Sequence, residues 1–342
     1  MCIRDRSYSF SVIIPAHNAA RFLPETLEAL AGNDLRNAEV LLVNDASSDN
    51  TVEVARRFEA PFNLKVVTSA TQLGPAGARN LGTREASAPL LLFLDADVVL
   101  PSQALFWIRE TLDLYSHRED VAGVLGAYSE DAPAGGFLTH FKNLSTTYLY
   151  KITETQSPFL HTAIFAVKRE ILELAGGFDV RLDRAEDFML GVNLGSQGYH
   201  FIIDRRLEAR HLKQYSMRDI LVEDWQRIQN LRRIRLSGRQ RRFSLKAHRW
   251  SRLISLASPG LVTVSVCLGF VKPELLWAAL ALVMVFLVAN LRFGLYLVRK
   301  RGIWFGLGSL LFLFLEMFWA SLAVLASFVI GRSKRITNTP TH

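Results

Sequence analysis

A short apolar segment followed by two aspartates constrains the fold of this chain more than any other feature. Leu90 to Leu94 is an unbroken apolar run preceded by a proline, and Asp95-Ala96-Asp97 follows it directly. Such a run is typical of a strand buried on both faces, as in a parallel sheet covered by helices. In open α/β sheets, ligands bind beyond the carboxyl ends of the strands. The segment therefore predicts an α/β fold with a polar site at the end of this strand.

The two aspartates, Asp95 and Asp97, suit a hard divalent cation. Carboxylates two residues apart just past a strand can converge on one ion, and Mg²⁺ or Mn²⁺ is usually shared with substrate phosphates. The same residues can also form an ordinary acidic turn that caps the next helix. The Asp-x-Asp pattern alone does not separate these two interpretations.

Strand and helix patterns alternate before Asp95. Apolar strands are predicted at about 10–15, 39–43, 64–68 and 90–94, and a helical pattern follows each of the first three. The cluster Ser47 to Asn50 supplies N-cap residues for one of these helices, and Gly74 to Gly77 leads into another. Short alternating units of this kind predict a doubly wound, mostly parallel sheet.

Charge and hydropathy divide the chain into three parts. The formal net charge is +8 over 342 residues, and the segment from Arg227 to Arg252 is rich in basic residues and has no acidic one. From Leu253 onward the chain is strongly apolar. The pattern predicts a soluble part, basic helices on an anionic membrane surface, and a membrane part. Nucleic-acid binding is the other use of so many arginines, but the adjoining apolar segments favour a membrane.

Three membrane spans are predicted, at about 253–271, 273–291 and 303–330. The basic segment before the first span and Arg299 to Arg301 after the second lie in the cytosol by the positive-inside rule. The basic residues 332–335 disagree, because an odd number of spans puts them outside. Glu316, in the middle of the third segment, also costs roughly 3 kcal/mol if it faces lipid. Either this segment packs against other helices or it is re-entrant, and both interpretations stay open.

Five motifs occur in an order and spacing that resemble one enzyme family. The motifs are SVIIPAHN, VLLVNDASSDNT, GPAGARNLG, LLFLDADVVL and GGFDVRLDRAEDFMLGVNLGSQGYHF, between Ser9 and His211. By these motifs the chain is identified as a member of the family 2 glycosyltransferases, which have the GT-A fold. The resemblance implies a metal-dependent, inverting transfer of a sugar from a nucleotide-diphosphate donor.

The resemblance also implies which residues bind the donor. They are Pro15, Ala16, Asn18, Asp45, Arg79, Asp95 and Glu186. Asp45 would accept hydrogen bonds from the nucleotide base, Arg79 would contact the nucleotide, and Asp95 would lie on the ribose side. From local sequence, Asp45 fits a helix cap as well, and Arg79 fits a solvated helix residue.

A metal ligand and a general base are implied in the same way. Asp97 would hold Mg²⁺ or Mn²⁺, which neutralises the charge that grows on the leaving diphosphate. Some family members complete this site with a histidine at the position of His211, although a lone histidine also fits a packing role. Asp187 would be the general base, at a helix N-terminus that keeps its carboxylate ionised. Local sequence alone fits helix capping by Glu186 or Asp187 equally well.

The expected organisation follows from these parts. Residues 1–8 are a sequence artefact or a disordered start, since the first five match what a sequencing-library transposon end would encode. A GT-A glycosyltransferase domain spans 9–215, basic interfacial helices 216–252, a membrane domain 253–331 and a tail 332–342. No signal peptide is predicted, so the catalytic domain is expected in the cytosol. The cysteines, Cys2 and Cys267, are expected to form no disulfide.

The sequence thus predicts a multi-pass protein of the inner (plasma) membrane with a cytoplasmic catalytic domain. It would move one sugar to a hydroxyl of a lipid or lipid-linked acceptor, as in glycolipid synthesis for the cell envelope. The alternatives are a polyprenyl-phosphate sugar synthase and a non-catalytic membrane module that binds sugar nucleotide. A polymerising synthase is disfavoured, because its Gln-x-x-Arg-Trp motif does not occur near Gln226. LLFLDADVV also resembles the first motif of haloacid-dehalogenase-type phosphatases, but that motif lies on the first strand of its fold, and three strands precede it here.

Overall fold

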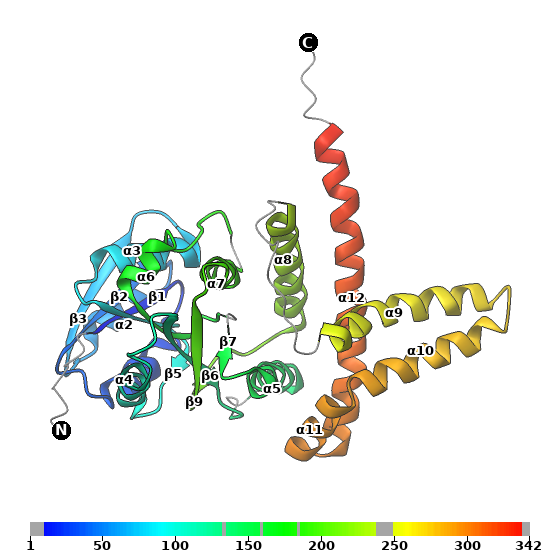
Figure 1. Cartoon of the computed structure of the whole chain (residues 1–342), viewed down its shortest axis with the longest axis horizontal. Helices are drawn as coiled ribbons and strands as arrows, with labels where there is room; N and C mark the ends of the chain where they lie inside the picture. The colour runs from blue at the N-terminus through cyan, green and yellow to red at the C-terminus, as the bar shows by residue number, and fades with distance from the viewer. Residues whose placement is uncertain (1–9, 132–134, 158–159, 183–184, 237–248, 337–342) are drawn as a thin grey trace, which may run out of the picture. The chain divides into compact units, whose positions relative to one another are not determined.

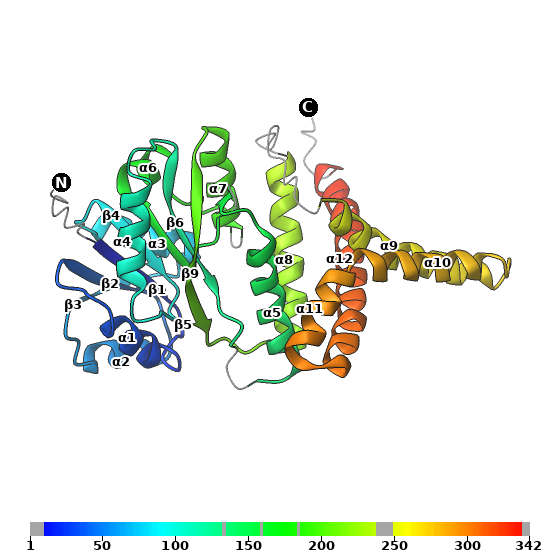
Figure 2. The same cartoon turned by 60° about the horizontal axis from the view of Figure 1, so that its bottom comes forward.

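The computed structural model describes residues 10–131, 135–157, 160–182, 185–236 and 249–336. These residues form two compact units that divide between Gln214 and Tyr215. The first unit is a sheet with helices and the second consists of long helices (Figures 1 and 2). Residues 1–8, the basic stretch 237–248 and the last part of the predicted tail, 337–342, lie outside the described residues.

The first unit is built on one mixed sheet. The strand order among the described residues is β3-β2-β1-β4-β8-β6-β9-β5, with β7 beside β9. The strands are β1 (Phe10–Ala16), β2 (Ala38–Asp45), β3 (Asn63–Ser69), β4 (Leu90–Leu94), β5 (Val98–Val99), β6 (Val121–Tyr128), β7 (Gln156–Ser157), β8 (Ile164–Lys168) and β9 (His200–His211).

Strand direction decides where the strand ends meet. β3, β2, β1 and β4 are parallel, so Ala16 lies opposite Asn44, and Asp45 lies opposite Ser69, at one edge of the sheet. β8 runs antiparallel between β4 and β6, whereas β6 and β9 are parallel to each other. The mixed α/β sheet is consistent with the predicted GT-A fold. The antiparallel strand was not predicted, because the apolar pattern of a short strand carries no information on its direction.

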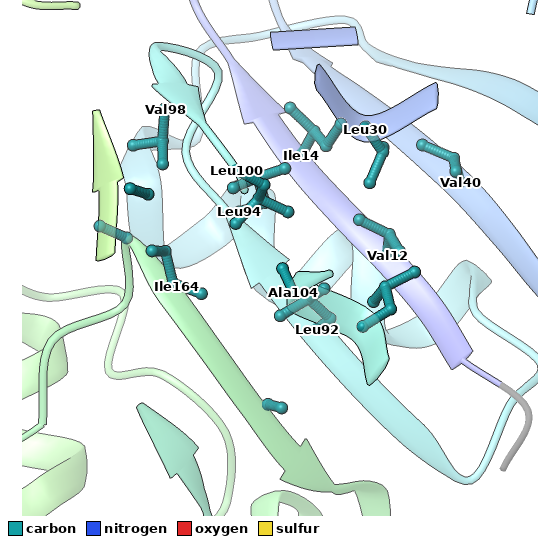
Figure 3. Close-up of a cluster of buried hydrophobic side chains, with 14 of the residues drawn as sticks. Val12, Ile14, Leu30, Val40, Leu92, Leu94, Val98, Leu100, Ala104 and Ile164 are labelled. Carbon is teal, nitrogen blue, oxygen red and sulfur yellow. The ribbon is translucent and has the colours of Figure 1, made fainter. Parts of the chain in front are cut away.

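Helices cover both faces of this sheet. They are α1 (Leu23–Ala31), α2 (Thr51–Arg57), α3 (Gly74–Glu85), α4 (Ala104–Leu114), α5 (Phe137–Ile152), α6 (Arg169–Leu174) and α7 (Glu186–Ser196). Val12 and Ile14 of β1 point into one apolar cluster, drawn in Figure 3, while Ile13 points into the other. The residues of β4 are no more than 4% exposed, so the prediction of a strand buried on both faces is confirmed.

The helix α3 lies unusually close to the sheet. A Cβ atom on Gly82 would come within 2.4 Å of the Ile13 side chain, so only glycine permits this approach. Arg79 lies one turn earlier on α3. The close contact at Gly82 therefore brings Arg79 near the end of β4.

The second unit contains helices only, among the residues described. They are α8 (Met217–Leu236), α9 (Arg249–Gly269), α10 (Leu275–Ala289), α11 (Leu291–Arg301) and α12 (Ile303–Ile336). The helices α9 and α10 lie side by side as an antiparallel hairpin in both views (Figures 1 and 2).

These helices differ from the three predicted spans. By length and composition one described helix, Ile303–Ser327, can cross a membrane, or two can if α10 and α11 count as one bent span. The apolar part of α9 ends at Gly269 and is shorter than the roughly 20 residues that a span needs. The predicted span 273–291 is interrupted because the chain bends by 62° after α10. At this bend the Asn290 side-chain amide donates to the Phe286 carbonyl and to the Ser255 hydroxyl.

Candidate active site

Asp45 ties the end of β2 to the start of α3. Its carboxylate is 3% exposed and accepts hydrogen bonds from the backbone N–H groups of Leu73, at 2.6 Å, and Gly74, at 2.9 Å. Gly74 has a φ of +74°, which a glycine adopts without strain. The carboxylate therefore holds the loop that begins α3, a capping role that leaves further lone pairs on both oxygens for a ligand.

The loop after β1 is locked against the loop after β2. Asn18 has a left-handed φ of 52°, and its side-chain oxygen accepts hydrogen bonds from the backbone N–H groups of Ser48 and Asp49. His17 Nδ1 lies 2.7 Å from the Asp45 carbonyl oxygen. Because a carbonyl only accepts, Nδ1 carries the proton, and Nε2 of the neutral ring accepts from the amides of Asn18 and Gln72. These contacts fix an imidazole at the exposed rim beside Asp45.

Arg79 joins two carboxylates in the interior of the first unit. Its guanidinium is 5% exposed and donates to Glu186 Oε1, at 2.7 Å, and to Asp95 Oδ1, at 3.0 Å. The ring of Phe178 lies 5.6 Å from the guanidinium carbon. The interpretation of Arg79 as a solvated helix residue is therefore wrong. A buried cation connects the end of β4 with the start of α7.

Charge and burial oppose each other in this cluster. Burial lowers the pKa of Arg79, but the negative charges of Asp95, Glu186 and Asp187 outweigh burial and raise it. Burial raises the pKa of Glu186, an effect that Arg79 opposes and Asp187 adds to. Asp187 accepts a hydrogen bond from the N–H of Phe188 in the first turn of α7. One cation thus stabilises several carboxylates that would otherwise repel one another.

Replacing Arg79 with methionine is expected to destabilise the first unit. A buried charge left without its partner costs about 3–5 kcal/mol, and here two carboxylates lose theirs. The loss should shrink as the pH falls, because the folded-state pKa of Glu186 is already raised and protonation removes the unpaired charge. Urea unfolding at several pH values measures it, and Arg84→Met on the exposed side of α3 is the matched control. An equal loss of unfolding free energy in both variants would contradict the stabilising role of Arg79 in this cluster.

Asp97 and His211 form a second pair at the same edge. The antiparallel pairing of β5 with β9 places Val98 opposite His211, and His211 Nε2 lies 3.2 Å from Asp97 Oδ2. The side chains are 23% and 9% exposed. Burial raises the pKa of Asp97, but the hydrogen bond and charge of His211 together lower it. Asp97 therefore stays ionised beside an imidazole nitrogen.

Aromatic rings support His211 from behind. Tyr128, at the end of β6, stacks on the imidazole with centroids 4.4 Å apart and planes 5° apart. The ring of His161 meets Tyr128 edge-on at 5.3 Å, and Tyr150 meets His161 edge-on at 5.9 Å. Burial, followed by the charges of nearby Asp187 and Asp95, raises the pKa of Tyr150. The rings form a row between the Arg79 cluster and the Asp97–His211 pair.

The structure brings most of the predicted site residues to one edge of the sheet. Pro15 and Ala16 end β1 beside β2. Asp95 and Asp97 follow β4, and Glu186 and Asp187 lie in the first turn of α7. The sequence alone did not indicate five further residues beside the site: His17, Gln72, Tyr128, Tyr150 and His161. His17 stands inside the Pro-Ala-His-Asn loop and could have been noticed there, whereas the other four are joined to the site only by the fold.

A surface hollow of the first unit lies elsewhere. It has a volume of about 660 Å³, and Asn33, Arg36 and Phe62 are among its lining residues. These residues precede or follow the amino ends of β2 and β3, opposite the edge where the carboxylates gather. Its lining includes none of the carboxylates Asp95, Asp97, Glu186 and Asp187, so we assign no role to it.

The chain is similar to known glycosyltransferases in sequence and in fold. Residues 11–175, just under half of the chain, match the family model of Glycosyl transferase family 2. The mannosyltransferase PcManGT from Pyrobaculum calidifontis, solved with GDP-Man and Mn²⁺, has a TM-score of 0.57 at 20% identity, over 93% of this chain and 88% of that one. This likeness supports the GT-A fold.

Relatives in sequence carry transferase names. Poly(ribitol-phosphate) beta-N-acetylglucosaminyltransferase TarS of Staphylococcus aureus (strain MW2) is 31% identical over 42% of this chain and 28% of its own length. Probable glycosyltransferase YdaM of Bacillus subtilis (strain 168) is 28% identical over 56% and 47%. Amylovoran biosynthesis glycosyltransferase AmsB of Erwinia amylovora is 28% identical over 62% and 71%. The chain spans less than half the length of the first two.

Proposed function

We propose that this chain is an inverting glycosyltransferase. It moves one sugar from a nucleotide-diphosphate donor to a hydroxyl of a lipid or lipid-linked acceptor at the cytosolic face of a membrane. The observation that carries the proposal is the gathering of Asp95, Asp97, Glu186 and Asp187 with Arg79 and His211 at the carboxyl edge of a family 2 domain.

Donor binding is assigned to the ends of β1, β2 and β4. Asp45 lies beside the imidazole of His17 and takes the nucleotide base, and Asp95 takes the ribose side. Ligands of α/β sheets bind at this edge. PcManGT was solved with GDP-Man, and TarS residues 1–349, with a TM-score of 0.50, were solved with UDP. These structures support a nucleotide donor here, while the base and the sugar stay undefined.

Asp97 and His211 suit Mg²⁺ or Mn²⁺. An ionised carboxylate oxygen and an imidazole nitrogen lie 3.2 Å apart, and carboxylate oxygens suit both ions. Within the described ranges no three His, Cys, Asp or Glu side chains are close enough to hold an ion by themselves. The donor diphosphate would therefore complete the coordination. The bound ion would supply Lewis-acid stabilisation of the diphosphate charge.

Asp187 is the proposed general base. It takes the proton of the acceptor hydroxyl as that oxygen attacks the anomeric carbon. The bond from this carbon to the diphosphate oxygen breaks on the opposite side, and the electron pair leaves with the diphosphate, so the configuration inverts. Arg79 and Glu186 position the start of α7, and thereby Asp187, through the contacts described above. A positioned base contributes typically 10²- to 10⁴-fold to such a step.

Purified protein incubated with a panel of nucleotide sugars tests the proposal. We expect hydrolysis or transfer of one donor that depends on Mg²⁺ or Mn²⁺, with release of the nucleoside diphosphate. Failure of every donor, alone and with membrane lipid extracts as acceptor, would favour the non-catalytic module that binds sugar nucleotide.

Tyr128 is expected to position His211. Tyr128→Phe keeps the stacked ring and should bind Mn²⁺ with a nucleoside diphosphate as the unaltered protein does, whereas Tyr128→Ala should bind it about tenfold more weakly. The weakening is expected because an aromatic pair contributes about 0.5–1.5 kcal/mol. Calorimetry measures the Mn²⁺ affinity directly. Equal affinity in both variants would leave the ring with a packing role only.

We further propose that the second unit anchors the chain at an inner (plasma) membrane as a multi-pass protein with its catalytic unit in the cytoplasm. Basic residues around Arg299 to Arg301 place this segment on the cytosolic side. A cysteine introduced at Lys300 should resist a membrane-impermeant maleimide in intact cells and react after lysis. Labelling in intact cells would refute this topology.

A further inference from the structure

The second unit exposes apolar side chains and buries polar ones. Between Leu253 and Leu325, 23 large apolar side chains are exposed, among them Phe270 (87%), Trp277 (74%) and Val288 (68%). The buried polar side chains of the same stretch are Ser255, Ser258, Ser309 and Glu316. In water, an exposed apolar surface of this extent would far exceed the patches that are usual on a soluble protein. The distribution suits helices that pack through small and polar residues inside a lipid environment.

The α9–α10 hairpin is apolar along its length and polar at both ends. At its base, the Ser255 hydroxyl and the Asn290 amide exchange hydrogen bonds of 3.1 and 2.8 Å. At its tip, Lys272 and Glu274 are exposed. At 1.5 Å per residue, Leu253–Gly269 spans about 25 Å and Leu275–Ala289 about 22 Å. Both lengths fall short of the roughly 30 Å of a hydrocarbon core, a mismatch that local thinning of the bilayer accommodates at modest cost.

Helix α12 meets the hairpin at its base. The rings of Phe314 and Phe286 lie 5.2 Å apart near the end of α10, and the Ser321 hydroxyl donates to the Leu256 carbonyl near the base of α9. Beyond these contacts the hairpin projects away from α12 in both views (Figures 1 and 2). The two cannot therefore both stand upright in one bilayer.

One face of α12 is exposed and apolar from Trp304 to Leu325. The exposed residues are Trp304, Leu307, Leu311, Leu315, Leu322 and Leu325, at helical spacing. The buried face of the helix carries Ser309, Phe312, Glu316, Ala320 and Ala323. A helix that lies in the headgroup region turns an apolar face to the lipid and keeps its polar residues on the opposite face.

We propose that the α9–α10 hairpin inserts into the hydrocarbon core of a bilayer while α12 lies along the interface at its base. This inference rests on the proposed membrane location and specifies which surface meets the hydrocarbon. The occupant of the apolar hairpin surface is lipid, because the apolar stretch ends in polar groups on both sides at a spacing close to the thickness of a bilayer.

This arrangement removes two conflicts of a three-span topology. With α12 at the interface, the C-terminal basic residues 332–335 stay on the same side as Arg299 to Arg301, as the positive-inside rule requires. Glu316 then lies at interfacial depth, where a carboxylate costs much less than at the bilayer centre.

Spin-label depth measurements test the proposal. Single cysteines replace Leu261, at mid-hairpin, or Leu315, at the middle of α12, in a chain with Cys2→Ser and Cys267→Ala. The labelled full-length protein is reconstituted in vesicles of phosphatidylethanolamine and phosphatidylglycerol. We expect the ratio of oxygen to nickel-chelate collisions to be about tenfold higher at Leu261 than at Leu315, equivalent to about 1.4 kcal/mol in partitioning.

Two outcomes would overturn the proposal. Equal depth at both positions, at the bilayer centre, would mean that α12 spans the membrane beside the hairpin. Nickel accessibility at Leu261 equal to that of a label at Arg84 on the first unit would mean that the hairpin does not insert, and dipolar broadening there would identify a second copy as its partner. Donor turnover is assayed on the same samples, so a failed transferase activity is distinguished from a failed depth pattern.

Discussion

Asp187→Asn is expected to abolish sugar transfer while donor and metal binding persist. An amide of the same size keeps the start of α7 and its hydrogen bond to the Phe188 N–H, but it cannot accept a proton. Without a base the hydroxyl must attack while still protonated, and the rate should fall roughly 10²- to 10⁴-fold. Steady-state transfer and donor affinity are measured on the same preparation.

Neighbouring carboxylates provide the controls for Asp187→Asn. Asp179→Asn alters a carboxylate that pairs with exposed Arg181, and it should transfer normally. Glu186→Gln removes the negative charge opposite Arg79 and should lower stability more than it lowers proton transfer. Efficient transfer by Asp187→Asn would contradict the base assignment. A product with a sugar-phosphate-polyprenol linkage would favour the polyprenyl-phosphate sugar synthase, because a phosphate acceptor needs no base.

The order of the elements could be predicted because each strand of the parallel half is a local signal. The apolar run before Asp95 and the Gly-rich start of α3 each carry their own pattern, so strands, helices and the polar edge follow from sequence. The direction of β8 could not be predicted. It depends on the pairing of Leu92 with Ala166, which are far apart in the chain.

The candidate site shows the same division. The resemblance to the family indicated the carboxylates, but it gave no reason to place Arg79 between Asp95 and Glu186, because those contacts join residues 16 and 107 positions apart. The row of rings behind His211 was missed for the same reason. Its members come from separate strands, loops and helices, and no local spacing connects them.

In the second unit, hydropathy predicted apolar helices but not their directions. A window of apolar residues is equally compatible with a span, a hairpin arm or an interfacial helix. The bend at Asn290 and the contacts of α12 with the hairpin base bear on this choice, and both depend on side chains from different helices. The basic residues at 332–335 and Glu316 in the middle of the third segment were the two signs in the sequence against three membrane spans.

Asp97→Asn is expected to remove divalent-metal binding and, with it, transfer. A neutral amide beside His211 loses the ionised oxygen that lies 3.2 Å from Nε2, and the site keeps a single strong ligand. Mn²⁺ affinity in the presence of a nucleoside diphosphate should fall by at least about 100-fold, which corresponds to about 2.8 kcal/mol. Calorimetry and Mn²⁺ paramagnetic resonance measure this loss independently of turnover.

The controls for Asp97→Asn separate metal binding from folding. Asp120→Asn, a carboxylate that pairs with Arg118 outside the site, should bind Mn²⁺ normally, while His211→Ala should bind it weakly but measurably because Asp97 remains. Thermal unfolding shows whether the Asp97 variant keeps its fold. Turnover by Asp97→Asn at the unaltered rate with the metal chelated would exclude the Lewis-acid role, since the diphosphate would then leave without the cation that this pair is proposed to hold.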